Sequence, residues 1–506
     1  SNTHLQSLSV QLESRYVAAS NKIIFMELAM GNIKPESQIK VLKNRKCQKY
    51  AYFLKHIWRE SKHRLSKDVE QVIALKRIPA YSAWVNGTEK LLSGLSVKFN
   101  GAELPINSAI GMIGTLPDSQ RQKLIKLVHE KIKSISYFAE SELNAVILNK
   151  KIDDDLRGFK NPYSATIMEY ENDETVIMNL MNLVNQYQRV AHRFFRIKAK
   201  LMDKQKLTYA DLNVNLSIKK QTYTWDSAIN IIKKSFAKVD PQYLEIFERY
   251  LKNGQIDVYP RTGKTGGGFC SSGHRLPTYI LLNWTDELRS LTTLAHEMGH
   301  GVHAELSKSQ NVFHEDHPIS IAEVASTLFE NFVFEEIISG LSFEEQVYAR
   351  FNRLQEAMGA VFRQGAYINY ELEIHKQIRE QGTLQADDFA RIMQQQLQNH
   401  LGKVFDITRD DGYLWVRYMH SRWFFYSYSY AYGHLISTIL YKKYKEDNSF
   451  IKQINQFLSA GGSDTPENIF KSIGIDTSRG SFWESGLRAI EQEVIELEKM
   501  VKKLNK

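Results

Sequence analysis

Two histidines and a glutamate with the spacing of a metal site occur in Leu291–Ser307, which reads LTTLAHEMGHGVHAELS. His296 and His300 are four residues apart, so on a helix both imidazole rings project from one face and can bind one zinc ion. Glu297 then lies where a general base for an attacking water molecule is needed. The apolar, helix-compatible residues before the pattern favour this interpretation over two core histidines with an incidental glutamate.

A catalytic zinc site needs a third protein ligand and one open position. The segment Ile319–Glu336, ISIAEVASTLFENFVFEE, carries Glu323 and Glu330 on one helix face among apolar neighbours. A carboxylate in such surroundings needs a partner, which predicts Glu323 as the third ligand. Glu330 is expected either to accept a hydrogen bond from a ligand histidine or to be an ordinary helix carboxylate. His303 is expected beside the site, because one helix can hardly supply three ligands and the base.

The segment Tyr259–Phe269, YPRTGKTGGGF, contains a Gly-Lys-Thr sequence like the end of a phosphate-binding P-loop. The P-loop pattern requires a glycine where this chain has Val258, because backbone amides must surround the phosphates ahead of the lysine. The residues that follow, TYILLNW at Thr278–Trp284, predict a strand where a P-loop would have a helix. We therefore expect no nucleotide site here.

The elements that must position these residues are mostly helices. Apolar residues recur at three- and four-residue steps from Gln6 to about Ala80, then up to about Tyr250, and from Leu288 to the end. Asn100-Gly101 between alternating residues predicts a hairpin with a type I′ turn. The glycine-rich stretch 257–284 predicts one small sheet just before the histidine helix. The C-terminal helix is expected to dock on the core through one apolar stripe. That stripe comprises Leu487, Ile490, Val494, Leu497 and Val501.

The composition is that of a large globular protein, with 506 residues, 43% hydrophobic and 24% charged. The net charge of +9 is moderate, and the basic run 40–49 has few interleaved aromatic residues, so we expect no nucleic-acid partner. No apolar run approaches the roughly 20 residues that span a bilayer, so we expect no membrane partner. Cys47 and Cys270 form no pair motif, which favours a reducing, cytoplasmic location. The oligomeric state is unknown from sequence.

Together these motifs resemble the M3 family of zinc metallopeptidases and, within it, the oligoendopeptidase F branch. The segments quoted above carry the resemblance, together with VFRQ at 361–364 and HSRWFFYSYSYAYG at 420–433. Residues 83–104 and 148–162 match more loosely. The resemblance implies a helical region over residues 1–80, which matches poorly, then a helical lobe with a short hairpin over 81–205. It places the zinc metallopeptidase catalytic domain at residues 206–506.

The resemblance implies a mainly α fold with two lobes, a deep channel, and a small active-site β-sheet next to the HExxH helix. It also implies one zinc ion per chain and an endopeptidase that hydrolyses internal bonds of short, unfolded oligopeptides. In this family the glycine-rich segment belongs to the active-site sheet. Gly266, Gly267 and Gly268 are therefore expected to let the main chain of a peptide substrate approach closely.

The resemblance further assigns roles in the segment that begins at His420. It implies that His420 and Tyr430 donate hydrogen bonds to the substrate carbonyl or its oxyanion, with Tyr426 as a substitute candidate in the substrate site. Tyr428 and Tyr432 could equally be core residues. The tyrosine spacing fits both a strand and a helix, so periodicity does not decide between them.

Two other functions stay open from sequence. The first is a helical zinc carboxypeptidase or dipeptidyl carboxypeptidase, which would act from a chain end. The second is a catalytically silent peptide-binding protein on the same scaffold. The presence of Glu297 and of all three ligand candidates argues against the silent protein.

Overall fold

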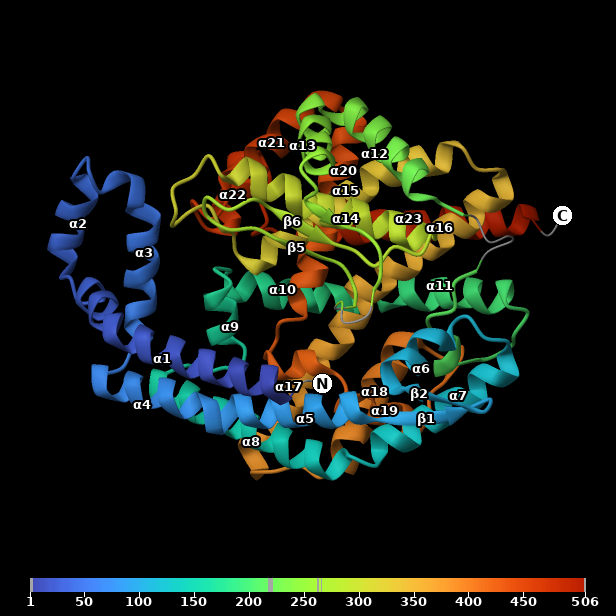
Figure 1. The fold of residues 1–506 in the computed structure, drawn as a ribbon, viewed down its shortest axis with the longest axis horizontal. Helices are drawn as coiled ribbons and strands as arrows, with labels where there is room; N and C mark the ends of the chain where they lie inside the picture. The colour runs from blue at the N-terminus through green and yellow to red at the C-terminus, as the bar shows by residue number, and fades with distance from the viewer. Residues whose placement is uncertain (1–2, 217–221, 262–263, 265, 505–506) are drawn as a thin grey trace. The chain divides into compact units, whose positions relative to one another are not determined.

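The computed structural model describes residues 3–216, 222–261, 264 and 266–504. The chain forms two compact units (Figure 1). Unit 1 consists of Ser1–Met168, Asn369–Gln396 and Ile407–Tyr426, and unit 2 consists of Glu169–Ile368, Leu397–Asp406 and Ser427–Lys506. The predicted mainly α fold with a small sheet beside the HExxH helix is confirmed. The domain boundaries at residues 80 and 205 and the channel stay predictions.

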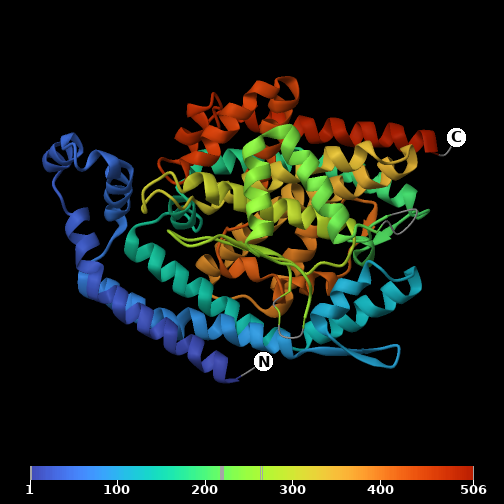
Figure 2. The same cartoon turned by 45° about the horizontal axis from the view of Figure 1, so that its top comes forward.

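Unit 1 contains long helices that pack side by side, with α1 against α4 and α5 against α8 (Figures 1 and 2). Its hairpin has Asn100 and Gly101 at φ 49° and 82°, so the predicted type I′ turn is confirmed. The longer elements are α1 (Thr3–Gly31), α2 (Pro35–Lys43), α3 (Ala51–Glu60), α4 (Lys67–Arg77), α5 (Ala83–Gly94), β1 (Ser96–Phe99), β2 (Ala102–Pro105), α6 (Ile106–Ile113), α7 (Asp118–Lys133), α8 (Ser136–Arg157) and α19 (Arg409–Gly412). Short helical turns are η1 (Gln48–Tyr50), η2 (Ser61–His63), η3 (Ile78–Ser82), η6 (Tyr413–Val416) and η7 (Met419–Arg422).

Three helices carry the chain from one unit into the other. They are α9 (Ser164–Glu169), α17 (Gln364–Gln381) and α18 (Ala386–Leu401). The segment after α18 returns to unit 1 and ends at Tyr426, and the chain then enters unit 2 for the last time.

Unit 2 is built around α15, which packs on both α14 and α20, and α23 is docked against α10, α11, α16 and α20. The predicted apolar stripe of the C-terminal helix is confirmed, because all five of its residues are buried. The helices of unit 2 are α10 (Glu174–Gln186), α11 (Gln188–Leu201), η4 (Tyr209–Asp211), α12 (Trp225–Val239), α13 (Pro241–Lys252), α14 (Leu288–Ser307), α15 (Ile319–Ser339), α16 (Phe343–Ala357), η5 (Met358–Arg363), α20 (Tyr428–Glu446), η8 (Asn448–Phe450), α21 (Ile451–Ala460), α22 (Pro466–Ser472) and α23 (Gly480–Leu504).

A three-stranded sheet lies against α14 in unit 2. Its strands are β4 (Ile256–Asp257), β5 (Phe269–Ser271) and β6 (Tyr279–Leu281), in the order β4-β6-β5. The central strand β6 is parallel to β4 and antiparallel to β5, and the strand order leaves β5 at an edge of the sheet among the described residues. A second small sheet pairs β3 (Leu207–Thr208) with β7 (Phe405–Asp406) in parallel.

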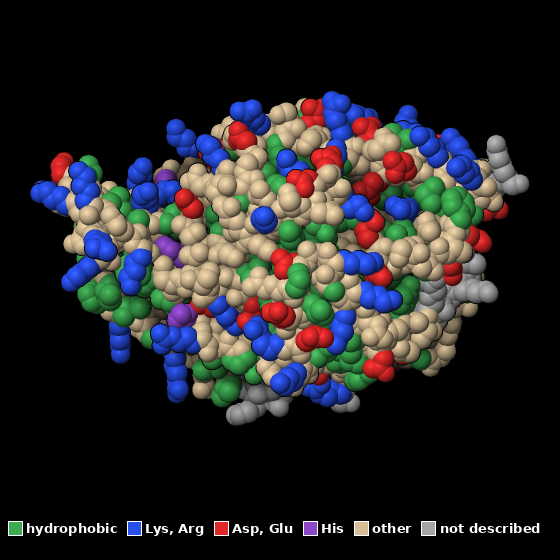
Figure 3. All heavy atoms as spheres, turned by 90° about the horizontal axis from the view of Figure 1, so that it is seen from above, with side chains coloured by type: hydrophobic (Ala, Val, Ile, Leu, Met, Phe, Trp, Pro, Cys, Tyr) green, Lys and Arg blue, Asp and Glu red, His purple; other side chains and the backbone are tan. Residues whose placement is uncertain are grey.

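The surface carries dispersed charge. On the face shown in Figure 3, basic side chains project from the N-terminal helices at the left, and elsewhere they are interspersed with acidic ones. The basic residues of the run 40–49 are exposed, as a solvated surface requires. Within the described part of the chain, every helix is too short or too polar to span a lipid bilayer.

The contact between α14 and α15 is unusually close at Gly299. A Cβ atom added to Gly299 would lie 2.6 Å from Ser326 Cα and 2.9 Å from the backbone oxygen of Ala325. These are backbone atoms that no rotamer change can move aside. The glycine therefore sets the distance between the two helices.

We expect Gly299→Ala to lower the free energy of unfolding by about 3 kcal/mol, because the added methyl group forces the backbones apart. Gly111→Ala in α6 is the matched control, since an added Cβ there meets no atom within 4 Å. We expect the control to be neutral or to stabilise by up to about 1 kcal/mol. Urea unfolding of both variants measures the difference, and equal stabilities would contradict the packing argument.

Candidate active site

Helices α14 and α15 bring the three predicted metal ligands together. One ligand atom from each of His296, His300 and Glu323 lies within 4.8 Å of the other two. His296 Nε2 is 3.5 Å from Glu323 Oε2. Ligand atoms bound about 2 Å from one zinc ion lie roughly 3–3.5 Å apart, so a small contraction of this arrangement would suit the ion. The donor set of two imidazoles and one carboxylate is typical of catalytic zinc.

Glu330 fixes the orientation of His296. The Nδ1–H group of His296 donates to Glu330 Oε1 at 2.5 Å, and this leaves Nε2 directed at Glu323. The expected hydrogen bond between Glu330 and a histidine predicted as a ligand is therefore present. A carboxylate in this position holds the imidazole in one tautomer and makes its free nitrogen a better metal ligand.

Glu297 lies buried beside the ligands, with 6% of its surface exposed. Burial raises the pKa of its carboxyl group, and repulsion from Glu323 and Glu330 adds to the rise. The His296 charge and a hydrogen bond from the Cys270 backbone oppose it, and the resulting pKa is about 7. Glu297 can therefore both accept and release a proton near neutral pH.

His296 and His300, the two histidines predicted as ligands, have opposite protonation behaviour when no metal is bound. Burial lowers the pKa of His296, but the hydrogen bond and charge of Glu330 outweigh burial and raise it to about 9. Burial and the neighbouring His296 charge hold the pKa of His300 well below its usual range. His300 is thus neutral at pH 7, whereas metal binding at His296 requires the release of a proton.

The glycine-rich segment approaches the site beside the edge strand β5. A Cβ atom on Gly268 would lie 2.8 Å from Thr293 Cγ2 and 3.1 Å from Glu297 Oε1, so any other residue there would have to push these two side chains aside. Gly266 and Gly267 instead leave open space, since an added Cβ meets nothing within 4 Å. The Gly267 carbonyl accepts a hydrogen bond from Asn283 Nδ2 at 2.8 Å.

The lysine of the Gly-Lys-Thr sequence, Lys264, stabilises its own loop. Lys264 Nζ donates to the backbone oxygens of Asp257 and Tyr259, at 3.1 and 2.8 Å. The ammonium group is therefore engaged by its own loop, in contrast to the free lysine of a P-loop. Gly263 and Thr265 lie outside the described residues.

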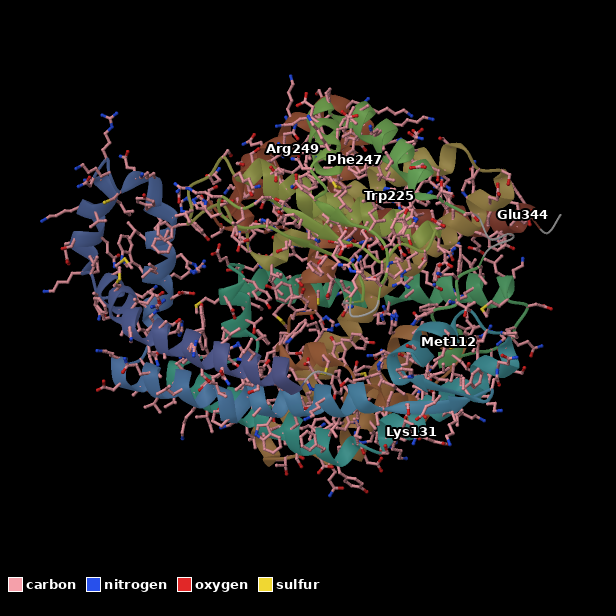
Figure 4. All side chains as sticks on the ribbon, in the orientation of Figure 1. Met112, Lys131, Trp225, Phe247, Arg249 and Glu344 are labelled. Atoms are coloured by element: carbon pink, nitrogen blue, oxygen red, sulfur yellow. The ribbon has the colours of Figure 1, made fainter. Side chains whose placement is uncertain are left out.

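A polar network that the sequence did not predict anchors the C-terminal half of α14. Glu305 accepts hydrogen bonds from Arg249, Thr278 and Lys308, at 2.6, 2.8 and 2.7 Å. Arg249 comes from α13 (Figure 4), and Thr278 precedes β6. The network ties the metal helix to the sheet and to α13. Arg249 and Thr278 are far from Glu305 in sequence, so no local pattern points to their bonds with it.

His303 is fully buried and belongs to the interior. Its ring stacks on that of His317, with centroids 3.9 Å apart and planes 15° apart. Among the described residues, neither of its ring nitrogens has a hydrogen-bond partner. His303 is therefore a core residue that packs against His317 and is closed off from solvent.

The segment from His420 contributes to both units. In unit 1, the rings of His420 and Tyr426 lie 5.4 Å apart and nearly parallel, and Trp423 contacts both. Burial lowers the pKa of His420, which favours the neutral imidazole. Tyr430 belongs to α20 in unit 2. The rings of His420 and Tyr426 therefore form a pair. Tyr430 comes after them, inside α20, which begins at Tyr428.

The tyrosines from Tyr428 onward lie on the helix α20, so their spacing is that of a helix and not of a strand. Tyr428 and Tyr432 are each 1% exposed, so they are core residues, and Tyr428 Oη accepts a hydrogen bond from Asn172 Nδ2 at 3.0 Å. Tyr430 lies one turn before Gly433, where an added Cβ would lie 2.8 Å from Glu323 Cβ. The tyrosine-bearing helix therefore packs directly on the helix of the third ligand.

Comparisons with known proteins agree with this geometry. A sequence profile described as Peptidase family M3 matches residues 117–489, and one described as Oligopeptidase F matches residues 31–96. Oligopeptidase PepF of Bacillus subtilis (strain 168) is 23% identical over 517 residues, covering 99% of this chain and 77% of that protein. Group B oligopeptidase PepB of Streptococcus agalactiae is 24% identical, covering 90% of this chain and 77% of its own length.

Solved structures share the fold. The crystal structure of oligoendopeptidase-F from Enterococcus faecium aligns with a TM-score of 0.78 at 19% identity, covering 99% of this chain and 88% of that chain. The resemblance to the oligoendopeptidase F branch is thereby confirmed. Because the M3 profile spans most of the sequence and includes both metal-site helices, this chain belongs to peptidase family M3.

Proposed function

We propose that this M3 peptidase is a zinc-dependent endopeptidase that hydrolyses internal bonds of short, unfolded oligopeptides. The convergence of His296, His300 and Glu323 beside the buried base Glu297 carries this proposal. The names of the relatives, oligopeptidase and oligoendopeptidase, favour it over a carboxypeptidase acting from a chain end. A cytoplasmic location and independence from membranes and nucleic acid stay predictions.

His296, His300 and Glu323 would hold one zinc ion per chain, with Glu330 supporting His296. The bound ion would lower the pKa of a water molecule and polarise the scissile carbonyl. Glu297 takes the proton from the attacking water and passes it to the leaving amine. Its pKa of about 7 in the metal-free protein suits a group that must do both, although the charge of a bound cation lowers that value.

The edge of β5 is the proposed place for the substrate main chain. Within the described residues, β5 pairs on one side only, with β6. An extended peptide can add to such an edge through backbone hydrogen bonds. Gly266 and Gly267 leave the approach open, and Gly268 keeps the strand close to Glu297.

His420, Tyr426 and Tyr430 are the proposed donors to the substrate carbonyl. The close packing of α20 on Glu323 is an argument for Tyr430, because this residue lies on α20. The stacking of the two rings is an argument that His420 and Tyr426 act together. A donor directed at developing negative charge stabilises the transition state more than the ground state.

A peptide of about ten residues with both ends blocked tests the proposed reaction, since it offers no free terminus to an enzyme that acts from chain ends. We expect internal cleavage that a chelator abolishes and added zinc restores. Mass spectrometry of the products identifies the bonds. Turnover only of unblocked peptides would favour the carboxypeptidase, and zinc binding without turnover would favour the silent peptide-binding protein.

We expect Glu297→Gln to lower kcat by roughly a thousandfold while zinc content stays at the parental level, because the amide cannot accept the water proton. Glu344→Gln, at the start of α16, is the control, because it makes the same chemical change on a different helix. We expect this variant to keep the parental kcat. Kinetics and metal analysis of both variants provide the comparison. A Glu297→Gln enzyme within a few-fold of the parent would disprove the base assignment.

We expect Tyr430→Phe or Tyr426→Phe to lower kcat by roughly a hundredfold with little change in KM, because the lost hydroxyl acts mainly in the transition state. Tyr428→Phe is the control, since that hydroxyl is buried against Asn172. One fluorogenic peptide serves for all three variants. If both test variants keep the parental kcat with zinc bound, neither tyrosine stabilises the oxyanion.

A further inference from the structure

Two bulky residues in unit 1 have a backbone conformation that such residues rarely adopt. Phe424 and Phe425 have φ angles of 46° and 60°, in the left-handed region that favours glycine. Every other non-glycine residue with positive φ in the described part of the chain occurs singly. Conformations of this kind persist only where the surroundings enforce them, and they concentrate at functional sites. Contacts around Phe424 and Phe425 must therefore hold this backbone conformation in place.

A buried carboxyl group holds the backbone of the pair. The Phe425 N–H group donates to Oε2 of Glu371 on α17 at 2.5 Å, and the Glu371 side chain is fully buried. Its other oxygen, Oε1, has no hydrogen-bond partner among the described residues. Burial raises the pKa of Glu371 to about 8, against the opposing effects of the Phe425 hydrogen bond and the Arg422 charge. Near pH 7 the group is therefore mostly a neutral acid whose identified contact is the Phe425 amide.

The two aromatic rings are anchored to the same helix. His375, one turn after Glu371 on α17, contacts the Phe424 ring edge-on at 5.7 Å and the Phe425 ring at 5.0 Å. The Phe425 ring also packs edge-on against Tyr163 at 5.8 Å. Backbone and side chains of the turn are thus both fixed to α17.

Arg422, two residues before Phe424, fixes the other side of the turn. Its guanidinium group forms a fully buried ion pair with Glu142, at 3.0 and 2.6 Å. It also donates to the backbone oxygens of Trp415 and Tyr418, at 3.1 and 3.0 Å. The chain therefore enters the turn from a rigid point.

The turn brings His420 and Tyr426 together. Their rings lie 5.4 Å apart and 28° from parallel although five residues separate them. Tyr426 directly follows the residue whose amide Glu371 holds, and α20 begins two residues later. Any relaxation of Phe425 would move Tyr426 first.

We propose that Glu371 is a positioning residue: its carboxyl group holds the Phe425 amide, and thereby keeps the His420–Tyr426 pair in the arrangement used in peptide hydrolysis. This role rests on the proposed function of His420 and Tyr426. Glu371 contacts the turn and acts on the reaction only through that pair.

Glu371→Gln and Glu371→Leu test the proposal on one fluorogenic peptide with zinc-loaded enzyme. Gln keeps a neutral oxygen acceptor, so we expect kcat within about threefold of the parent. Leu leaves the Phe425 amide unpaired, so we expect kcat to fall roughly 10- to 100-fold with KM within about twofold and zinc content unchanged. Tyr370→Phe, the neighbouring buried residue on α17, is the control and should keep the parental kcat. Parental kcat in Glu371→Leu would overturn the proposal.

A combined variant separates positioning from general destabilisation. In a background that carries both His420→Ala and Tyr426→Phe, Glu371→Leu should cause no further loss of kcat, because both groups that it positions are already gone. An undiminished second loss would overturn the positioning role. If Glu371→Leu does not fold, Glu371→Asp replaces it, because the shorter acid stretches the same hydrogen bond. We expect Glu371→Asp to lower kcat at least fivefold, and a smaller loss would overturn the proposal.

The same set of variants separates this proposal from the proposed function. If the variant that combines His420→Ala with Tyr426→Phe keeps the parental kcat, the role of the pair in hydrolysis fails, and the positioning role fails with it. If that variant loses activity while Glu371→Leu or Glu371→Asp keeps it, only the positioning role is overturned.

Discussion

The close approach of α14 and α15 at Gly299 is the contact on which the metal site depends. A side chain there would meet backbone atoms of Ser326 and Ala325, so the helices could not keep their present separation. That separation brings Glu323 to 3.5 Å from His296 and lets Glu330 reach the other ring nitrogen. One missing Cβ thus allows two helices to act as a single ligand-bearing surface.

The charges gathered by this contact explain why the site needs a cation. Burial, together with the charges of Glu323 and Glu330, raises the pKa of Glu297 to about 7, and Glu330, Glu323 and Glu297 raise that of His296 to about 9 against the effect of burial. In the metal-free protein a proton on His296 partly balances the carboxylates. A divalent ion would replace that proton and neutralise more charge, so the acidic surroundings that make Glu297 a base also favour metal binding.

Sequence alone predicted the parts of the site that obey helix periodicity. The shared face of His296 and His300 follows from their four-residue spacing, and the choice of Glu323 follows from its apolar surroundings. The strand β6 follows from the apolar run at Thr278–Trp284. The hydrogen bond from the Cys270 backbone to Glu297 could not be predicted, because it joins a strand to a helix by tertiary packing. Nor could the Phe424–Phe425 turn, since no residue in it marks a left-handed backbone.

X-ray absorption spectroscopy of the zinc-loaded protein tests the central claim most directly, because it reports the atoms bound to the metal. The account predicts one zinc per chain with two imidazole nitrogens and carboxylate or solvent oxygens at about 2.0–2.2 Å. The spectrum of Glu323→Ala should lose the carboxylate contribution or the metal itself. A sulfur ligand at about 2.3 Å, or an unchanged spectrum in Glu323→Ala, would contradict the ligand set.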